Sequence, residues 1–246
     1  MSVPETPTFE FTHLTEQSYA AAQSIVPLVI DILGPLDSVV DLGGGAGGWL
    51  RVFQESGVRN IRLFDHPGVQ SSDLLISPDF FTPCDLSVET PAPVVCNLVM
   101  TIECLEHLPE SRADAMVDFL VKSSDFVLFS AAIPLQGGHK HINEQPSCYW
   151  RDKFADHGYA SLDIIRPRII FNKNIPWWLR QNLRLYVRRS AIDQIPAAKR
   201  EPFLPDDMDI VSEQVLTMRP PELTLRQLFS KIPAALAEAI RYRWGR

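Results

Sequence analysis

Apolar residues change their spacing along the chain, from helical spacing near the N-terminus to short runs separated by helical stretches. Between Glu16 and Leu33 they recur every three or four residues until Gly34-Pro35, which predicts a helix that ends there. Short apolar or β-branched runs predict strands at Ser38–Leu42, Asn60–Phe64, Val94–Thr101, Asp125–Ser130 and Ala160–Arg166. Helical stretches lie among them at Gly48–Ser56, Arg112–Lys122 and Tyr149–His157. This alternation predicts an α/β fold with a doubly wound, mostly parallel sheet.

The alternation fades after about Arg168, which divides the chain into three parts. Residues 1–36 are expected to form a helical segment that packs on or caps the core, and residues 37–168 the core itself. Residues 169–246 are expected to form a mainly helical extension, with helices at Leu223–Phe229 and Ala234–Trp244. Such an appendage could cover a substrate site or form a homo-oligomer contact.

Composition narrows the class of protein. A hydrophobic fraction of 46% indicates a globular chain with a sizeable core. The formal net charge of −7 disfavours a nucleic-acid partner. A local basic cluster at Arg180, Arg184, Arg188 and Arg189 would place several arginines on one helical face, which favours a solvated helix surface over an anion site. The N-terminus lacks a signal-peptide pattern, and no apolar run approaches the roughly 20 residues that span a bilayer, so a cytoplasmic location without membrane contact is expected.

A glycine-rich turn follows the first predicted strand and opens a helix, in the segment Val39 to Trp49 (VVDLGGGAGGW). Glycine allows a sharp turn and a close approach of the backbone to a ligand at the carboxyl end of a strand. A dinucleotide-binding turn would place a pyrophosphate over the helix N-terminus. Here the glycines stand at every second position after Asp41, and an acid at that point suits a cationic ligand better.

Further acids follow predicted strands in chain order. Asp65 ends the second strand, where a carboxylate can accept bidentate hydrogen bonds from ribose hydroxyls. Asp85 and Leu86 precede the Val94–Thr101 strand, and that strand runs into Glu103-Cys-Leu-Glu106-His107-Leu-Pro. A turn residue is the plain alternative reading of Asp85.

Taken together and in this order, these motifs resemble those of class I S-adenosylmethionine-dependent methyltransferases, across about Val39 to Arg166. The resemblance implies a Rossmann-like fold with S-adenosylmethionine as cofactor. The cofactor's amino-acid portion would be held by Asp41, Gly43, Gly45 and Gly47, its ribose by Asp65, and its adenine by Asp85 with Leu86. The ExxEHLP segment and GGHKHINEQPSCYW are similar to a bacterial subgroup that modifies saccharides or secondary metabolites.

The ligand-binding edge also carries acids and histidines. Glu103, Glu106 and His107 could converge on a divalent cation, and oxygen and imidazole ligands suit Mg²⁺ or Mn²⁺. Some class I methyltransferases use an ExxEH segment as metal ligands, and the RNA enzymes among them add a later histidine. In other relatives the segment only organises the turn. His139 and His141 lie in a loop after the Asp125–Ser130 strand, and either could act as a general base.

The resulting hypothesis is methyl transfer to a small-molecule acceptor, most simply to an oxygen. An NAD(P)-dependent oxidoreductase would share the glycine turn and the acid of the second strand, but not the glycine spacing after Asp41, and a Tyr-x-x-x-Lys pair is missing. A non-catalytic S-adenosylmethionine-binding subunit would keep the same fold. The acceptor itself is not specified by these motifs.

Overall fold

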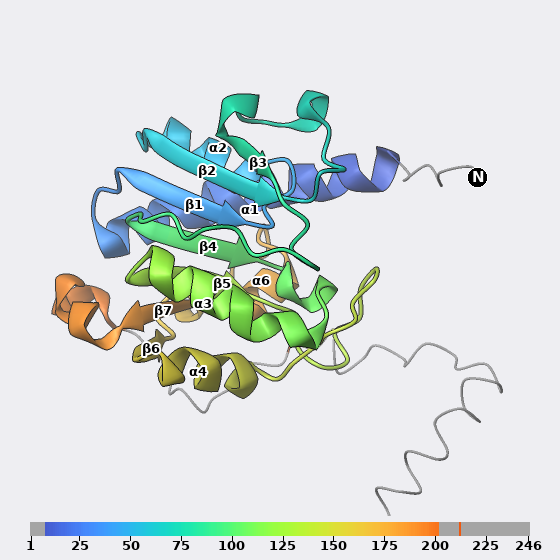
Figure 1. Ribbon diagram of the computed structural model, residues 1–246. Helices are drawn as coiled ribbons and strands as arrows, with labels where there is room; N and C mark the ends of the chain where they lie inside the picture. The colour runs from blue at the N-terminus through green and yellow to red at the C-terminus, as the bar shows by residue number, and fades with distance from the viewer. Residues whose placement is uncertain (1–7, 202–211, 213–246) are drawn as a thin grey trace, which may run out of the picture. The chain divides into compact units, whose positions relative to one another are not determined.

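The structure is a computed structural model that describes residues 8–201 and 212, with side chains from Glu16 onward. These residues form a sheet of seven strands in the order β3-β2-β1-β4-β5-β7-β6 (Figure 1). The helices expected at 223–229 and 234–244 lie outside the described residues.

The first five strands are parallel, which confirms the mostly parallel sheet. The last two run antiparallel, since β7 pairs antiparallel with both β5 and β6. The strands are β1 (Ser38–Leu42), β2 (Asn60–Asp65), β3 (Phe81–Pro83), β4 (Leu98–Ile102), β5 (Phe126–Ser130), β6 (Tyr159–Leu162) and β7 (Arg184–Arg188). Two of them, β3 and β7, lie where the apolar pattern predicts no strand.

The helices agree with the predicted alternation in the core. They are α1 (Thr8–Leu33), α2 (Gly48–Glu55), α3 (Ala113–Ser123), α4 (Ser147–Asp156), α5 (Arg166–Ile169) and α6 (Trp177–Asn182). Short 3₁₀ turns occur at Ser71–Asp73, Pro78–Phe80, Leu105–His107, Glu110–Arg112, Arg189–Gln194 and Ala197–Lys199. Gly34 ends α1 as predicted: it adopts a φ of 83° and its N–H donates to the carbonyl of Ile30 at 2.8 Å. No helix among the described residues is long and apolar enough to cross a membrane.

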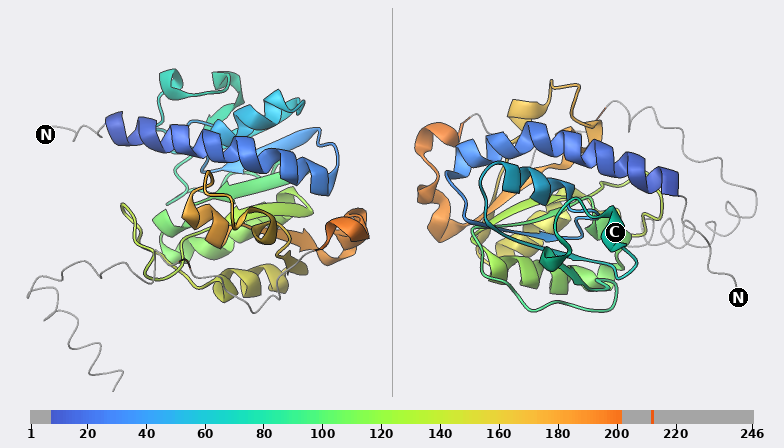
Figure 2. Two further views of the ribbon diagram at one scale, coloured as in Figure 1. Left: turned by 180° about the vertical axis from the view of Figure 1, so that it is seen from behind. Right: turned by 90° about the horizontal axis from the view of Figure 1, so that it is seen from above.

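Helices cover both faces of the sheet, and the alternation of side chains along each strand divides the core into two (Figure 2). Val39 of β1 points to the face covered by α1 and α2, where it joins Ile25 and Phe53. Its neighbour Val40 points to the face covered by α3 and α4, where it joins Phe119 and Phe154. This period of two is what a strand buried on both sides requires.

The chain beyond Arg168 contributes to the sheet as well as to its cover. Arg184 and Arg188 belong to strand β7 and not to a solvated helical face, so that prediction was wrong. Arg184 is buried near Asp163, and Arg188 pairs with Asp125 at 2.5 Å between Nε and Oδ1. The three residues between the two arginines are fully buried, which explains why the segment forms a strand.

The topology fixes where a ligand can bind. Strand β1 lies between β2 and β4, and the chain reverses its direction of winding at β1. In open α/β sheets, ligands bind in the crevice beyond the carboxyl ends of the strands at such a switch point. The glycine turn after β1 and the acidic segment after β4 both lie at this edge.

Candidate cofactor and acceptor site

The glycine turn between β1 and α2 adopts the backbone conformation that its sequence predicts. Gly43, Gly45 and Gly47 have φ angles of 81°, 58° and 79°, in the left-handed region that strains other residues. The N–H of Gly43 donates to the carbonyl of Phe64 at 2.7 Å, which ties the turn to β2. The alternate glycine spacing is therefore a steric requirement of this turn.

Asp41 lies directly beneath the turn. Its side chain is 1% exposed, and neither carboxylate oxygen has a hydrogen-bond partner among the described residues. A Cβ on Gly44 would lie 2.1 Å from Asp41 Oδ2, so only glycine lets the turn close over the acid. Burial, and secondarily the charge of Asp65, raise the pKa of Asp41 well above its usual value. The turn thus covers a buried acid with unused hydrogen-bonding capacity.

Asp65 at the end of β2 is already held by backbone donors. Its Oδ2 accepts from the N–H of Gly45 at 2.6 Å, and its Oδ1 accepts from the N–H of His66 at 2.6 Å. Burial raises its pKa, and these two hydrogen bonds act in the opposite direction. The acid after β2 and the glycine turn after β1 therefore form one unit.

Asp85 and Leu86 follow β3 at the same edge. Asp85 Oδ1 accepts from the N–H of Ser87 at 3.0 Å and from its hydroxyl at 2.6 Å, and these bonds lower the pKa of Asp85. The other oxygen, Oδ2, lies 3.9 Å from His66 Nε2. Leu86 is buried, and its carbonyl accepts from Arg112 Nε at 2.9 Å. His66 and Arg112 were not singled out from the sequence, because only the fold brings them to this segment.

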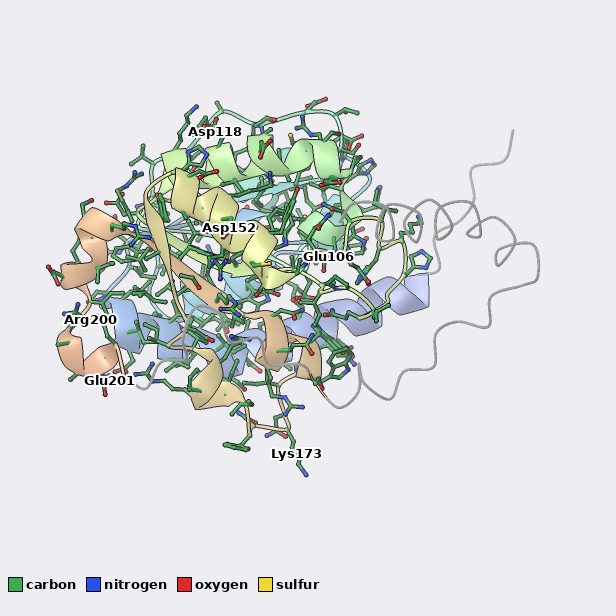
Figure 3. The ribbon with its side chains drawn as sticks, turned by 90° about the horizontal axis from the view of Figure 1, so that it is seen from below. Glu106, Asp118, Asp152, Lys173, Arg200 and Glu201 are labelled. Atoms are coloured by element: carbon green, nitrogen blue, oxygen red, sulfur yellow. The ribbon has the colours of Figure 1, made fainter. Side chains whose placement is uncertain are left out.

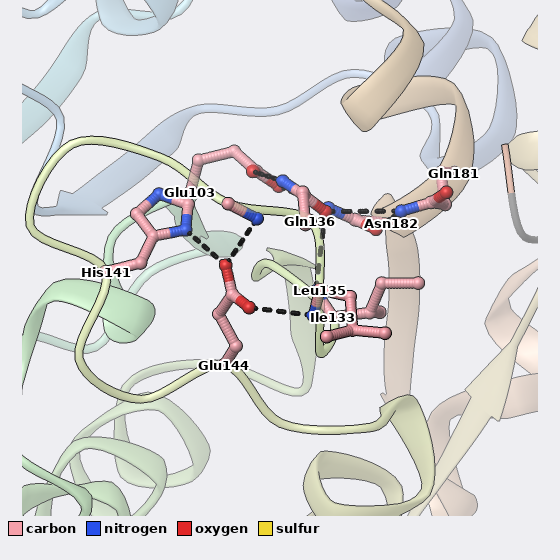
Figure 4. A network of polar contacts seen from close by, with 9 residues as sticks. Glu103, Ile133, Leu135, Gln136, His141, Glu144, Gln181 and Asn182 are labelled. Atoms are coloured by element: carbon pink, nitrogen blue, oxygen red, sulfur yellow. Dashed lines mark hydrogen bonds and ion pairs between the residues drawn. The ribbon is translucent and has the colours of Figure 1, made fainter. Parts of the chain in front are cut away.

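Glu103 lies near Glu106 but is not part of the group of ligand atoms that Glu106 and His107 form. Glu103 has a φ of 49°, and this turns its carboxylate toward the amides of Gln136 and Asn182, at 3.1 and 3.0 Å (Figure 4). The hydroxyl of Ser130 donates to it as well. Asn182 also donates to Gln136 Oε1 at 2.9 Å, so the network joins the β4 exit, the loop after β5 and α6.

Glu106 and His107 gather instead with His141. One ligand atom from each of the three side chains lies within 4.8 Å of the others. The main chain explains this approach, because the N–H groups of Ile142 and Asn143 donate to the carbonyl of Glu106 at 2.9 and 3.0 Å. Figure 3 shows Glu106 beside the segment that follows β5. The structure thus brings together two of the three predicted metal ligands and one of the two predicted catalytic histidines.

The electrostatics of this cluster follow from burial. The Glu106 side chain is fully buried, and its oxygens make no hydrogen bond of normal geometry with the described residues. Burial and nearby Glu103 raise the pKa of Glu106 well above its usual value, although the backbone amides of Glu106 and Ala132 oppose this. Burial and the neighbouring His141 lower the pKa of His107. The two imidazole rings meet edge to face, 4.9 Å apart.

His139 lies apart from this cluster. Its side chain is exposed, whereas His141 is largely buried, with 12% of its side chain exposed. Nδ1 of His141 lies 3.0 Å from Glu144 Oε1. Of the two candidate bases, His141 is therefore the one with a fixed orientation.

A small cavity of about 10 Å³ lies between β5, α4 and β7, close to the Glu103 network. That volume is about enough for one water molecule. Asn182 and Gln181 belong to both the cavity wall and the network. The rest of the wall comprises Phe129, Ala131, Ile133, Ser147, Trp150, Arg184 and Tyr186.

Comparison with known proteins gives a likeness of fold. Known protein families and curated proteins provide no sequence match to the chain. Human N-acetylserotonin methyltransferase in complex with SAM superposes with a TM-score of 0.52 and 13% identity, over 72% of this chain and 54% of that one. Magnesium protoporphyrin IX methyltransferase from Synechocystis, with bound SAH, superposes with a TM-score of 0.50 and 16% identity, over 76% of this chain and 90% of that one.

The chain therefore spans about half the length of the human enzyme, 54% of it. At these identities the likeness concerns the fold alone. It confirms the Rossmann-like, mostly parallel α/β architecture that class I S-adenosylmethionine-dependent methyltransferases share.

Proposed function

We propose that this protein is an S-adenosylmethionine-dependent methyltransferase that methylates an oxygen of a small-molecule acceptor. The observation that carries this proposal is the buried Asp41 carboxylate beneath a glycine turn that is itself bonded to Asp65. A ligand with an ammonium and a sulfonium would stabilise the ionised form of this buried acid, whereas a pyrophosphate over the turn would oppose its ionisation. The fold neighbours, whose names give SAM or SAH as bound ligands, are consistent with this choice.

Each part of the cofactor has a matching group in this chain. Asp41 and the glycine turn would hold the amino-acid portion, with Gly43, Gly45 and Gly47 allowing close approach of the backbone. Asp65 would bind the ribose hydroxyls, and Asp85 with Leu86 would bind the adenine. The cofactor supplies a methyl group on a positively charged sulfur, and the protein orients it for in-line attack.

Glu106, His107 and His141 would act on the acceptor. A buried carboxylate without a good hydrogen-bond partner beside two imidazoles fits a divalent cation such as Mg²⁺ or Mn²⁺. A cation held there would lower the pKa of an acceptor hydroxyl. Glu103 accepts hydrogen bonds from Ser130, Gln136 and Asn182, so it would stabilise the structure around this group and would not bind the cation itself.

Without a cation, His141 would act as the general base. An imidazole held at one nitrogen can accept the proton of an acceptor hydroxyl at the other. The exposed His139 is then the weaker choice, although it shares the loop. The names of the two fold neighbours mention N-acetylserotonin and magnesium protoporphyrin IX, which supports a small molecule as the acceptor class. Saccharides and secondary metabolites are the acceptors to test first.

Calorimetry with S-adenosylhomocysteine and, separately, with NAD tests the cofactor assignment. We expect S-adenosylhomocysteine to bind the wild-type chain and to bind Asp41→Asn more weakly, with no heat from NAD. Asp118→Asn is a matched control, because Asp118 lies on α3 and pairs only with the exposed Lys122 among the described residues. Binding of NAD without S-adenosylhomocysteine would instead support the oxidoreductase. Binding of S-adenosylhomocysteine without turnover on any acceptor panel would support a non-catalytic subunit.

A further inference from the structure

The loop between β5 and α4 curls around one carboxylate. Glu144 Oε2 accepts from the N–H of Leu135 at 2.9 Å, and Oε1 accepts from the N–H of Gly137 at 2.7 Å (Figure 4). The same Oε1 lies 3.0 Å from His141 Nδ1. Glu144 therefore touches three points of a loop that has little regular secondary structure.

These contacts determine which nitrogen of His141 carries the proton. A carboxylate only accepts hydrogen bonds, so the Nδ1 beside it must be the N–H of the neutral ring. The second nitrogen, Nε2, then has its lone pair available to bind a cation or a proton. The opposite tautomer would place two lone pairs against each other at 3.0 Å.

The surroundings of the ring restrict its position further. A Cβ on Gly138 would lie 2.2 Å from His141 Nε2, so a side chain at position 138 would force the ring out of its present position. The chain on the other side of His141 is fixed by the bonds from Ile142 and Asn143 to the carbonyl of Glu106. The ring is thus oriented by Glu144 and placed next to Glu106 and His107.

We propose that Glu144 is a positioning residue that fixes the tautomer and orientation of His141, so that the lone pair of Nε2 stays available in the group that His141 forms with Glu106 and His107. The role of Nε2 rests on the proposed function. The tautomer does not, because it follows from the contact between Glu144 and His141 alone. Carboxylates that orient histidine ligands typically change metal affinity or activity about 10- to 100-fold when they are replaced. Glu144 lies within the segment GGHKHINEQPSCYW, but the sequence alone gives it no role of its own.

A purely structural role makes a different prediction. If Glu144 only closed the loop through Leu135 and Gly137, its replacement would reduce methyl transfer or Mn²⁺ binding whether or not residue 141 is a histidine. If Glu144 acts through His141, its replacement would cause no further loss in a variant that lacks the imidazole. The two roles can therefore be separated by a double-mutant cycle.

The first experiment reads the tautomer directly. Long-range ¹H–¹⁵N spectra of the histidine rings are recorded on the full chain at alkaline pH, where imidazoles are neutral, and His141→Gln assigns the signals. We expect the Nδ1–H form of His141 in the wild type and in Asp118→Asn, and a loss of that preference in Glu144→Gln. A wild-type ring in the Nε2–H form, or an unchanged tautomer in Glu144→Gln, would overturn the proposal. This readout requires neither metal nor cofactor.

The second experiment measures the consequence at the site. Single-turnover methyl transfer and Mn²⁺ binding are compared for wild type, Glu144→Gln, His141→Gln and the double variant, with S-adenosylhomocysteine affinity as a check of folding. We expect Glu144→Gln to lower either the rate of methyl transfer or the affinity for Mn²⁺ about tenfold or more, and to cause no further loss in the His141→Gln background. An equal loss in both backgrounds would show that Glu144 only closes the loop.

The failure of the proposed function would look different from the failure of this inference. A wild-type chain that binds no S-adenosylhomocysteine would refute the cofactor assignment while the tautomer result still stood. A chain that binds the cofactor but shows the wrong tautomer would refute only the role of Glu144.

Discussion

The backbone N–H of Gly45 donates a hydrogen bond to the carboxylate of Asp65 at 2.6 Å, although the two residues stand 20 positions apart. The bond joins the turn after β1 to the end of β2, the two elements to which the cofactor's amino acid and ribose are assigned. Asp65 is therefore placed by the same turn that would contact the rest of the ligand.

Replacing Asp65 by Asn should weaken cofactor binding more than it weakens the fold. The amide keeps one acceptor oxygen, but its NH₂ group would face a backbone N–H of Gly45 or His66. Hydrogen bonds to charged groups contribute about 1.5–3 kcal/mol, so we expect about 10- to 100-fold weaker binding of S-adenosylhomocysteine by calorimetry. Unchanged affinity in Asp65→Asn, with Asp118→Asn as control, would contradict the ribose assignment.

Asp41 should make stability depend on pH in a defined direction. Its pKa is raised in the folded protein, so the folded state binds this proton more tightly than the unfolded state does. Stability should therefore fall as the pH rises from about 4, the usual pKa of an aspartate, through the raised folded-state pKa. Asp41→Asn lacks this loss and should be more stable than the wild type near neutral pH, while it binds S-adenosylhomocysteine more weakly.

Thermal unfolding of the wild type and Asp41→Asn between pH 5 and pH 8 checks this expectation. The difference in Tm should widen as the pH rises, in favour of the variant. A difference that stays constant across the range would show that Asp41 does not change its protonation on unfolding there.

The parts of the site that were predictable from the sequence are those set by local geometry. Alternate glycines after Asp41 mark a turn with left-handed φ angles, and the structure has positive φ at all three positions. Gly34 likewise ends α1 where the pattern stops. Such features depend on a few neighbouring residues, so a single sequence reveals them.

The parts that were not predictable depend on contacts between distant residues. His141 joins Glu106 and His107 because Ile142 and Asn143, in a loop far along the chain, donate hydrogen bonds to the carbonyl of Glu106. The carboxylate of Glu103 is bound by Asn182, 79 positions later. Strand β7 was missed because its arginines repeat at helical spacing, whereas in the strand Arg184 lies near the buried Asp163 and Arg188 pairs with the partly exposed Asp125.

A divalent cation at Glu106, His107 and His141 would make activity sensitive to chelators. We expect EDTA to abolish methyl transfer, and Mg²⁺ or Mn²⁺ to restore it. Because the pKa of Glu106 is raised, cation binding must displace its proton, so the affinity for Mn²⁺ should increase with pH. Glu106→Gln should remove the affinity while S-adenosylhomocysteine still binds. Full activity in chelator would contradict the cation. His141 would then act as the general base, and Glu106 would have only a structural role.

Gly138→Ala tests the arrangement of the acceptor side without removing any polar group. The new Cβ would lie 2.2 Å from His141 Nε2, so the imidazole must shift from its present position beside Glu106 and His107. Methyl transfer depends on the placement of reacting groups to within about 1 Å, where an error can cost about 100-fold in rate. We expect a loss of turnover of that order with S-adenosylhomocysteine affinity unchanged, because the glycine turn lies on another loop.

Ile142→Ala is the matched control, since this side chain is 65% exposed on the same loop. If Gly138→Ala and Ile142→Ala reduced turnover equally, the position of His141 would not be what the loop provides.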